Sequence, residues 1–161
     1  MKYWILIFLV LFSFVIQAKS NIQEVAIVKE YLKAAFDKQY QIQASYMHPD
    51  IIDYHPTILA PPAKGKEALI NGWKQSVEPM DSVKYHRKGL GTTDFYEGDL
   101  TGKWVFEAGL VEAKFKGMNK WVSFQMVGLY RIEDNLIIEV HNYGNLLDMY
   151  QQMGYTLVPP K

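Results

Sequence analysis

The second half of this chain consists of long segments in which apolar and polar residues alternate, separated by short polar turns. Alternation with a period of two is typical of strands that bury one face. Strands joined by such short turns pair with their neighbours in an antiparallel manner. We therefore expect a meander of antiparallel strands over residues 83–88, 104–115, 121–132 and 136–143, with turns at 116–119 and 133–135.

The segment from Trp104 to Phe115 changes its phase partway along. Apolar residues occupy even positions from Trp104 to Leu110 and odd positions from Val111 to Phe115, and Gly109 lies at the change. A bulge or a sharp bend exchanges the two faces of a strand in this way. The sequence therefore predicts a bend in this strand and a curved sheet.

Helical patterns come first in the chain. Apolar residues recur at helical spacing from Val25 to Phe36, which predicts an amphipathic helix from residue 22 to about residue 40. A second, short helical turn near 43–47 and a strand over 51–55 follow, and a further helix begins at Gly65 and ends before Pro79. This order indicates an α+β domain in which the N-terminal helices pack on the concave face of a cone-shaped, curved antiparallel sheet. The conical space between such layers is a common place for a small-molecule site.

The first twenty residues have the pattern of an export signal. Lys2 gives a positive start, residues 3–16 are almost unbroken apolar sequence, and Ala18 and Ser20 stand three residues and one residue before the expected cut. A membrane-spanning helix needs about 20 apolar residues, so a retained anchor is the less favoured alternative. We expect a signal peptide over 1–20, a domain over 21–161, and a periplasmic or secreted location.

The composition of the expected mature chain excludes several classes of partner. It holds 15 basic residues (17 minus Lys2 and Lys19) against 17 acidic ones, a net charge near −2. This balance favours neither nucleic acid nor an anionic membrane surface as a partner. Because the chain has no cysteine, an exported domain of this kind depends on burial rather than on disulfides for stability.

Three stretches of sequence, in this order, resemble the SnoaL-like branch of the nuclear transport factor 2-like superfamily. The first is Asp53-Tyr54-His55-Pro56 followed by Gly65-Lys66-Glu67, and the second is Met80-Asp81-Ser82. The third runs from Tyr130 to His141 and continues to Gln152-Met153-Gly154. The resemblance covers residues 22–158 and implies a cone-shaped fold whose pocket serves polyketide cyclases, isomerases, dehydratases and binding proteins.

Two residues depart from the pattern of that family. His141 stands where the family usually has tryptophan, and Asn145 stands where the cyclases place their acid–base aspartate. Asparagine cannot take up a proton at neutral pH. The resemblance therefore does not carry the usual cyclase mechanism over to this chain.

The remaining candidate base is His141, because an unperturbed imidazole titrates at about pH 6.5. We expect His55 and Asn145 to polarise a substrate oxygen, and Asp53 to orient His55 on the same strand face. Glu139, Tyr143 and Asn145 share the strand parity of His141, so we expect all four to point to one side if the strand stays regular. The alternative for His141 is a structural histidine, either buried or facing solvent.

Further residues are expected to line the cavity together with Asp53, Glu139 and Tyr143. They are aromatic, and they lie on the segments that face the conical space: Tyr54, Trp73, Tyr85, Trp104, Trp121 and Tyr130. Metal sites usually gather three or four ligands, and no such cluster is evident, so we expect neither a metal nor another cofactor.

Three hypotheses for the function follow. The first is an exported domain that binds a small, largely apolar molecule and catalyses cofactor-free proton transfer on it. The second is a non-catalytic binding or assembly module, which the asparagine at position 145 favours. The third is a structural homodimer, because members of this superfamily often pair through the sheet.

Overall fold

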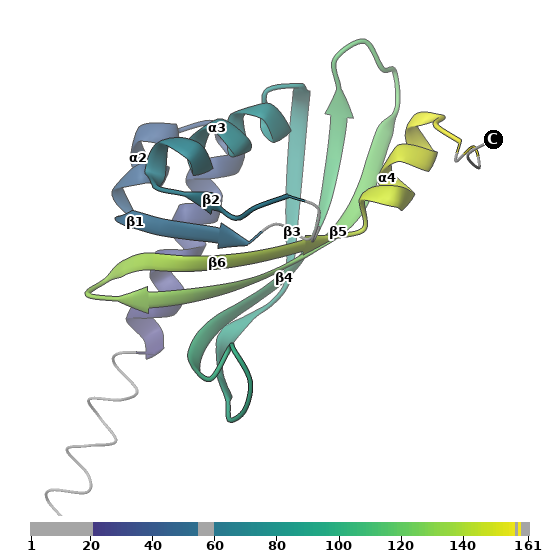
Figure 1. The fold of residues 1–161 in the computed structure, drawn as a ribbon. Coiled ribbons are helices and arrows are strands. Elements are labelled where there is room, and N and C mark those ends of the chain that lie inside the picture. Colours follow the sequence, from purple (N-terminus) through teal and green to yellow (C-terminus); the bar gives the residue numbers. More distant parts are fainter. Residues whose placement is uncertain (1–20, 55–59, 157, 159–161) are drawn as a thin grey trace, which may run out of the picture.

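A computed structural model describes residues 21–54, 60–156 and 158 of the chain. Helical residues 21–36 come first, and the other elements follow in this order: α2 (Tyr40–Ser45), β1 (Met47–Tyr54), β2 (Ala63–Lys64), α3 (Lys66–Val77), β3 (Met80–Phe95), β4 (Gly102–Phe115), β5 (Trp121–Glu133), β6 (Leu136–Gly144) and α4 (Leu146–Met153). The expected α+β class is confirmed: the N-terminal helices lie on one side of a curled sheet, and α4 lies beyond its far end (Figure 1).

The sheet has six strands in the order β2-β1-β6-β5-β4-β3, so β2 and β3 are its two edges and it does not close into a barrel. The strands from β3 to β6 form the expected antiparallel meander. β1, however, pairs with β6 in parallel, so the sheet is not purely antiparallel. This parallel pairing places the end of β1 beside the middle of β6, with Tyr54 opposite His141.

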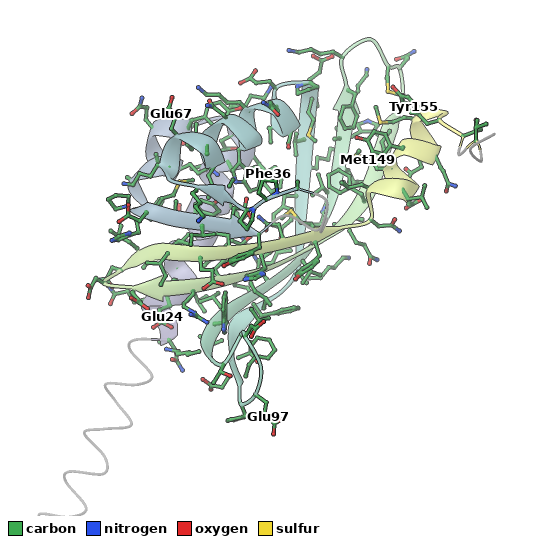
Figure 2. The ribbon with its side chains drawn as sticks, viewed as in Figure 1. Glu24, Phe36, Glu67, Glu97, Met149 and Tyr155 are labelled. Atoms are coloured by element: carbon green, nitrogen blue, oxygen red, sulfur yellow. The ribbon has the colours of Figure 1, made fainter. Side chains whose placement is uncertain are left out.

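The helices bury their apolar stripe against one face of the sheet. Val28, Tyr31 and Leu32 are fully buried and belong to the same core as residues of β3 to β6, and Ala35 is also fully buried. Phe36 lies between the helices and the sheet (Figure 2), where its ring stacks on Tyr85 with centroids 5.0 Å apart. We call the face that the helices cover the concave face and the opposite face the convex face.

The predicted first helix, from 22 to about 40, ends at residue 36, and the helical turn predicted near 43–47 is α2, at Tyr40–Ser45. Residues 21–36 are helical, Lys38 has a φ of 58°, and α2 starts at Tyr40. A residue in the left-handed region cannot continue a right-handed helix, so the chain turns there.

None of the helices in the part of the chain that the structure describes is both long and apolar enough to cross a membrane. The expected signal peptide lies outside the described residues.

The bulge predicted for β4 lies in the neighbouring strand β3. β4 pairs with β5 without a shift in register, and its odd positions from Val105 to Phe115 are buried throughout. The shift lies in β3, between Arg87 and Gly89, opposite Gly109. The sequence pattern predicted a change of face within β4 because its even positions also carry apolar side chains, and these lie on the convex face.

The C-terminal helix α4 completes the sheet at its far end. β6 stops at Gly144, so residues 121–125 of β5 extend beyond their neighbour. The Gln152 side chain bonds to this edge: its Oε1 accepts from the Ser123 N–H at 2.9 Å, and its Nε2 donates to the Ser123 carbonyl at 2.7 Å. The amide of Gln152 therefore replaces a neighbouring strand at this position.

Candidate functional site

Aromatic contacts with the helices identify which side chains point toward the concave face. Tyr31 of the first helix meets Tyr130 of β5 edge to face, with centroids 5.9 Å apart. Trp73 of α3 donates a hydrogen bond from Nε1 to the Tyr31 hydroxyl at 2.9 Å. Because side chains alternate along a strand, these contacts assign the faces of the whole sheet.

A single glutamate lies near the middle of the concave face. Glu107 of β4 has 0% of its surface exposed, and neither of its carboxyl oxygens accepts a hydrogen bond from the described residues. The nearest cation is Arg87 of β3, whose Nε is 3.8 Å from Oε1. Burial raises the pKa of Glu107 to about 7, because removal from water disfavours the charged form. Glu107 can therefore gain or lose a proton near neutral pH.

Two glycines allow two tyrosine rings to lie flat over the sheet beside Glu107. A β-carbon at Gly109 would be 2.3 Å from the Tyr85 hydroxyl oxygen, and one at Gly128 would be 2.4 Å from the Tyr130 hydroxyl oxygen. Gly109 is two residues from Glu107 on the same face, about 7 Å along the strand. Gly128 is the direct partner of Glu107 on β5. Both phenols consequently occupy positions next to the carboxyl group.

The two phenols differ in their hydrogen bonds. The Tyr130 hydroxyl donates to Oδ1 of Asn142 on β6 at 3.2 Å. Burial raises the pKa of Tyr130, and the nearby Tyr31 and Glu107 add to this effect. The hydroxyl of Tyr85 is buried and bonds to none of the described residues. Buried hydroxyl groups nearly always have a partner, so the Tyr85 hydroxyl has the capacity to bond to water or to a ligand.

The concave face continues toward α2 and β1. Gln43 of α2 is fully buried beside Tyr31. Burial raises the pKa of Tyr31, and the negative charge of Asp53 raises it further. We call this whole group the Glu107 cluster; it comprises Tyr31, Gln43, Asp53, Trp73, Tyr85, Arg87, Glu107, Tyr130 and Asn142.

The structure divides the residues that the sequence predicted for the pocket between the two faces. Asp53, Trp73, Tyr85 and Tyr130 belong to the Glu107 cluster. A second set, Tyr54, Trp104, Glu139 and His141, lies on the convex face. The division follows from strand parity: Asp53 and Tyr130 are both paired with Val140, whereas Tyr54 is paired with its neighbour His141.

The convex set forms a compact group that we call the Glu139 cluster, with Arg131 as its fifth member. Glu139 accepts from His141 Nε2 at 2.9 Å and pairs with Arg131 Nη1 at 3.3 Å. The guanidinium lies 4.4 Å from the ring centre of Trp104, and the Tyr54 ring stacks on His141 with centroids 4.5 Å apart. The expectation that His141 and Glu139 line the cone is not met, because the regular strand points them away from the helices.

The remaining predicted residues lie elsewhere. Asn145 caps α4, where its Oδ1 accepts from the Asp148 N–H at 3.2 Å, so it is not part of the β6 strand face. Trp121 is exposed on the convex face under Lys84, whose Nζ is 4.5 Å from the ring centre. Tyr143 is exposed on the same face. His55 lies outside the described residues. Within those residues, no three His, Asp or Glu side chains are placed to share a metal ion.

Five residues of the Glu107 cluster were not predicted from the sequence: Glu107, Arg87, Asn142, Tyr31 and Gln43. For Glu107 a signal was present: it occupies the buried phase of β4, between Val105 and Gly109 and in line with Val111. A carboxylate in an otherwise apolar phase is unusual, because burying a charge is costly. The even-numbered apolar residues of β4 concealed this phase.

Solved structures similar to this one cover most of the chain. A protein from Jannaschia sp. CCS1, proposed to be a SnoaL-like polyketide cyclase, is 18% identical with a TM-score of 0.65; the match covers 87% of this chain and 95% of that chain. An epoxide hydrolase from M. tuberculosis, described as LEH-like, is 14% identical with a TM-score of 0.62 and coverage of 82% and 90%. A protein from Catenulispora acidiphila with a ketosteroid isomerase-like fold, in complex with trimethylamine, is 19% identical with a TM-score of 0.62 and coverage of 83% and 97%.

These likenesses establish the nuclear transport factor 2-like fold and confirm, at the level of the fold, the resemblance to SnoaL-like proteins. No family model matches the sequence, and no curated protein matches it. Function therefore has to be argued from the side chains of this chain.

Proposed function

We propose that this domain binds a small, largely apolar carbonyl compound against its concave face and transfers a proton on it, with Glu107 as the acid–base group. One observation carries the proposal: a fully buried carboxyl group with a pKa of about 7 lies beside a phenol that has no partner among the described residues. A general base works best when its pKa lies near the working pH. Glu107 takes the role that the sequence analysis gave to His141.

The reaction needs only groups of this chain. The Glu107 carboxylate takes a proton from the carbon next to the carbonyl group, and the electron pair of the broken C–H bond moves to the carbonyl oxygen. The resulting enolate carries its charge on that oxygen, where a fixed donor stabilises it. Tyr85 is that donor, because the Tyr130 hydroxyl already bonds to Asn142. In a β,γ-unsaturated carbonyl compound this enolate is conjugated with the double bond, and return of the proton from Glu107 to the γ carbon moves the double bond next to the carbonyl group, which completes an isomerisation.

The rest of the cluster supplies charge and an apolar wall. The Arg87 side chain, 3.8 Å from Glu107, provides a positive charge close to the developing enolate. Trp73 meets both Tyr31 and Phe36 edge to face, and the three rings form an aromatic wall on the helix side. Such a wall suits an apolar substrate, and the polar groups opposite fix its orientation.

The solved structures support the coarser part of this proposal. Structures with this fold include a LEH-like epoxide hydrolase and proteins proposed to be polyketide cyclases, so the fold accommodates both ligand binding and catalysis. The identities are too low for residue roles to be transferred. The assignment of Glu107 therefore depends on the geometry described above.

Deuterium exchange tests the proposal directly. The probe is 2-tetralone in D₂O, and proton NMR follows the loss of signal from the carbon next to its carbonyl group. We expect Glu107→Gln to lower the enzyme-dependent exchange rate by about a hundredfold or more, the usual contribution of a positioned base. Tyr85→Phe should lower it by about tenfold, because one donor to the enolate is lost.

His141→Ala is the matched control, because it removes the titratable group predicted from sequence and leaves the concave face intact. We expect it to change the exchange rate less than about threefold. Loss of exchange in His141→Ala with retention in Glu107→Gln would reverse the assignment. Saturable quenching of tryptophan fluorescence by 2-tetralone without any exchange would instead establish a binding module.

Export of this domain is part of the same proposal, and it is supported by the sequence pattern of residues 1–20. The measurement is the intact mass of the protein recovered from its own host. A chain that begins at Asn21 is the expected result, and a full-length chain in the membrane fraction would contradict it.

A further inference from the structure

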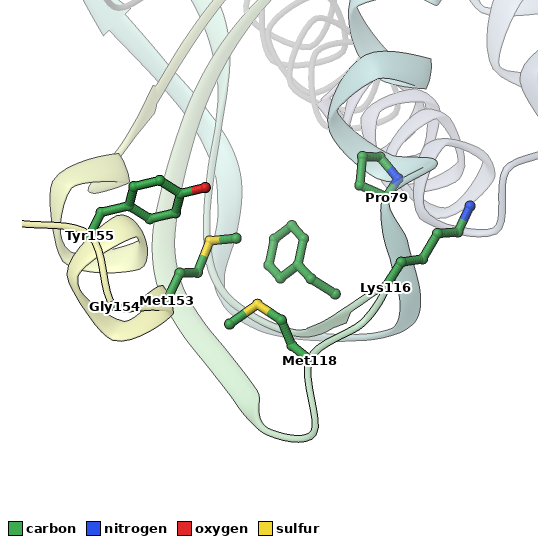
Figure 3. A pocket seen from close by; sticks show the side chains of 7 residues that line it. Pro79, Lys116, Met118, Met153, Gly154 and Tyr155 are labelled. Atoms are coloured by element: carbon green, nitrogen blue, oxygen red, sulfur yellow. The ribbon is translucent and has the colours of Figure 1, made fainter.

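A second concave region lies at the far end of the sheet, where α4, the β4–β5 turn and the start of β3 meet. It is a groove of about 460 Å³ lined by Pro79, Phe115, Lys116, Met118, Met153, Gly154 and Tyr155. Figure 3 shows the side chains of Met118, Met153 and Tyr155 directed into the same space. We call this region the terminal groove. Its volume lies within the range of small-molecule sites, about 300–1,000 Å³.

The lining of the terminal groove is apolar apart from one charge. Two thioethers, two aromatic rings and a proline ring form its walls. Methionine side chains are flexible and polarisable, so they adapt to apolar ligands of different shape. Lys116 is the only charged residue of the lining, and in Figure 3 its exposed side chain extends away from the two methionines. Its ammonium group makes no ion pair within the described part of the chain, and no acidic side chain of the described residues lines the groove.

The terminal groove is distinct from the Glu107 cluster. The two regions share β4, but Phe115 is eight residues from Glu107, about 26 Å along the strand. Between them the buried residues Val111, Ala113 and Phe124 fill the concave face. A ligand in the groove would therefore not touch Glu107.

We propose that the terminal groove binds a small amphipathic carboxylate, such as a medium-chain fatty acid. Its hydrocarbon chain lies between Met118 and Met153, and the exposed Lys116 side chain turns toward the rim to pair with its carboxylate, a rotamer change that exposed side chains make within nanoseconds. A single unpaired cation beside an apolar space selects a monoanion over a neutral or cationic molecule of the same shape. The burial of apolar area supplies the affinity, and Lys116 determines the orientation and the preference for an acid.

Methyl NMR with decanoate tests this site. In the full chain labelled with ¹³C-methyl methionine, we expect a saturable shift of the Met118 and Met153 methyl signals as decanoate is added. The Met47 and Met126 signals, from the buried core, serve as internal references and should stay in place. An absence of saturable shifts, or shifts confined to the reference signals, would overturn the proposal.

The role of the charge is tested with Lys116→Gln and with 1-decanol as a neutral probe. Lys116→Gln should weaken decanoate binding by about fivefold, the scale of one exposed ion pair, and should leave decanol binding unchanged. Lys120→Gln is the matched control, because it removes the same charge from the same turn outside the groove; it should change neither affinity. Equal weakening of decanoate by both variants would show general electrostatic attraction and overturn the assignment.

The apolar wall is tested with Met118→Ala and Met153→Ala. Each removes one side of the groove, so both probes should bind more weakly in each variant, by about threefold or more. Unchanged binding of both probes in both variants would place the ligand elsewhere. Circular dichroism of each variant confirms that it is folded before the titration.

Discussion

The two faces of the sheet each hold a largely buried glutamate, and the two residues differ in what surrounds them. Glu139 on the convex face has a histidine at 2.9 Å and an arginine at 3.3 Å. Glu107 on the concave face has one arginine at 3.8 Å and no hydrogen bond from the described residues. Glu139 is therefore electrostatically satisfied within the fold, whereas Glu107 is held in an environment that does not compensate its charge.

This difference in surroundings favours different roles for the two glutamates. Removing one partner from a buried ion pair is destabilising, because the other charge is left uncompensated. A buried carboxyl group without such partners takes up a proton more readily, and groups of this kind are found at functional sites. The difference therefore supports the chemistry proposed for the concave face and predicts that the convex cluster contributes to stability.

The largest expected effect is on stability, at the base of the Glu139 cluster. Trp104 is 1% exposed, lies under Arg131, and donates from Nε1 to the Leu100 carbonyl at 2.6 Å. Trp104→Ala should lower the free energy of unfolding by about 4 kcal/mol, measured by urea denaturation. Exchange of 2-tetralone by the folded fraction should persist. The exposed Trp121 is the control, and Trp121→Ala should cost less than about 1 kcal/mol.

The second prediction concerns the pH dependence that Glu107 imposes on stability. Its pKa is about 7 in the folded chain, against an ordinary value of 4.5. Between these values the folded state holds a proton that the unfolded state has lost, so stability falls as pH rises from 4.5 to 7. The decline should reach at most about 3 kcal/mol.

Glu107→Gln should abolish this decline, because the amide does not titrate. Urea denaturation at about pH 5, near the lower end of this window, and at about pH 8, above its upper end, provides the measurement. The free energy of unfolding of the variant minus that of the native chain should be more positive at about pH 8 than at about pH 5. Parallel pH profiles for the two proteins would show that the concave carboxyl group is compensated after all.

The third prediction has the opposite sign for the convex glutamate. Glu139→Gln leaves Arg131 and His141 without the carboxyl group that they share, so the free energy of unfolding should fall by about 2 kcal/mol near pH 7. Glu112→Gln is the matched control, since Glu112 bonds to His86 at 2.7 Å on a more exposed part of β4. It should cost less than about 1 kcal/mol. If both variants cost the same, the convex cluster is an ordinary surface pair.

The smallest expected effect is at Asn145. Asn145→Ala removes the N-terminal cap of α4 and should cost about 1 kcal/mol in a thermal or urea denaturation. Asn145→Asp keeps a capping oxygen and should restore the stability. Neither variant should alter exchange of 2-tetralone. A gain in exchange rate in Asn145→Asp would place this residue in the reaction site and contradict its assignment as a cap.

Much of the fold could be predicted from the sequence, because local patterns determine local structure. The alternation from residue 104 to residue 143 predicted β4, β5 and β6 within about two residues. Gly65 was correctly placed at the start of α3. The parity of β6 also grouped Glu139 with His141 and Tyr143 correctly, which is why one error about the face moved all three together. Pairing of two copies through the sheet stays a prediction.

Only the tertiary structure decided which face of each strand meets the helices. Strand periodicity determines that Glu139 and His141 share a side, but it does not say which side, because both faces of β4 and β5 carry apolar residues. Packing of the helix over 21–36 against Tyr130 settles the choice, and it buries Glu107. The pKa of Glu107 is raised because the residue is removed from water. That burial depends on packing between segments far apart in the sequence, such as the helix that carries Tyr31 and the strand that carries Glu107. No local pattern in the sequence contains that information.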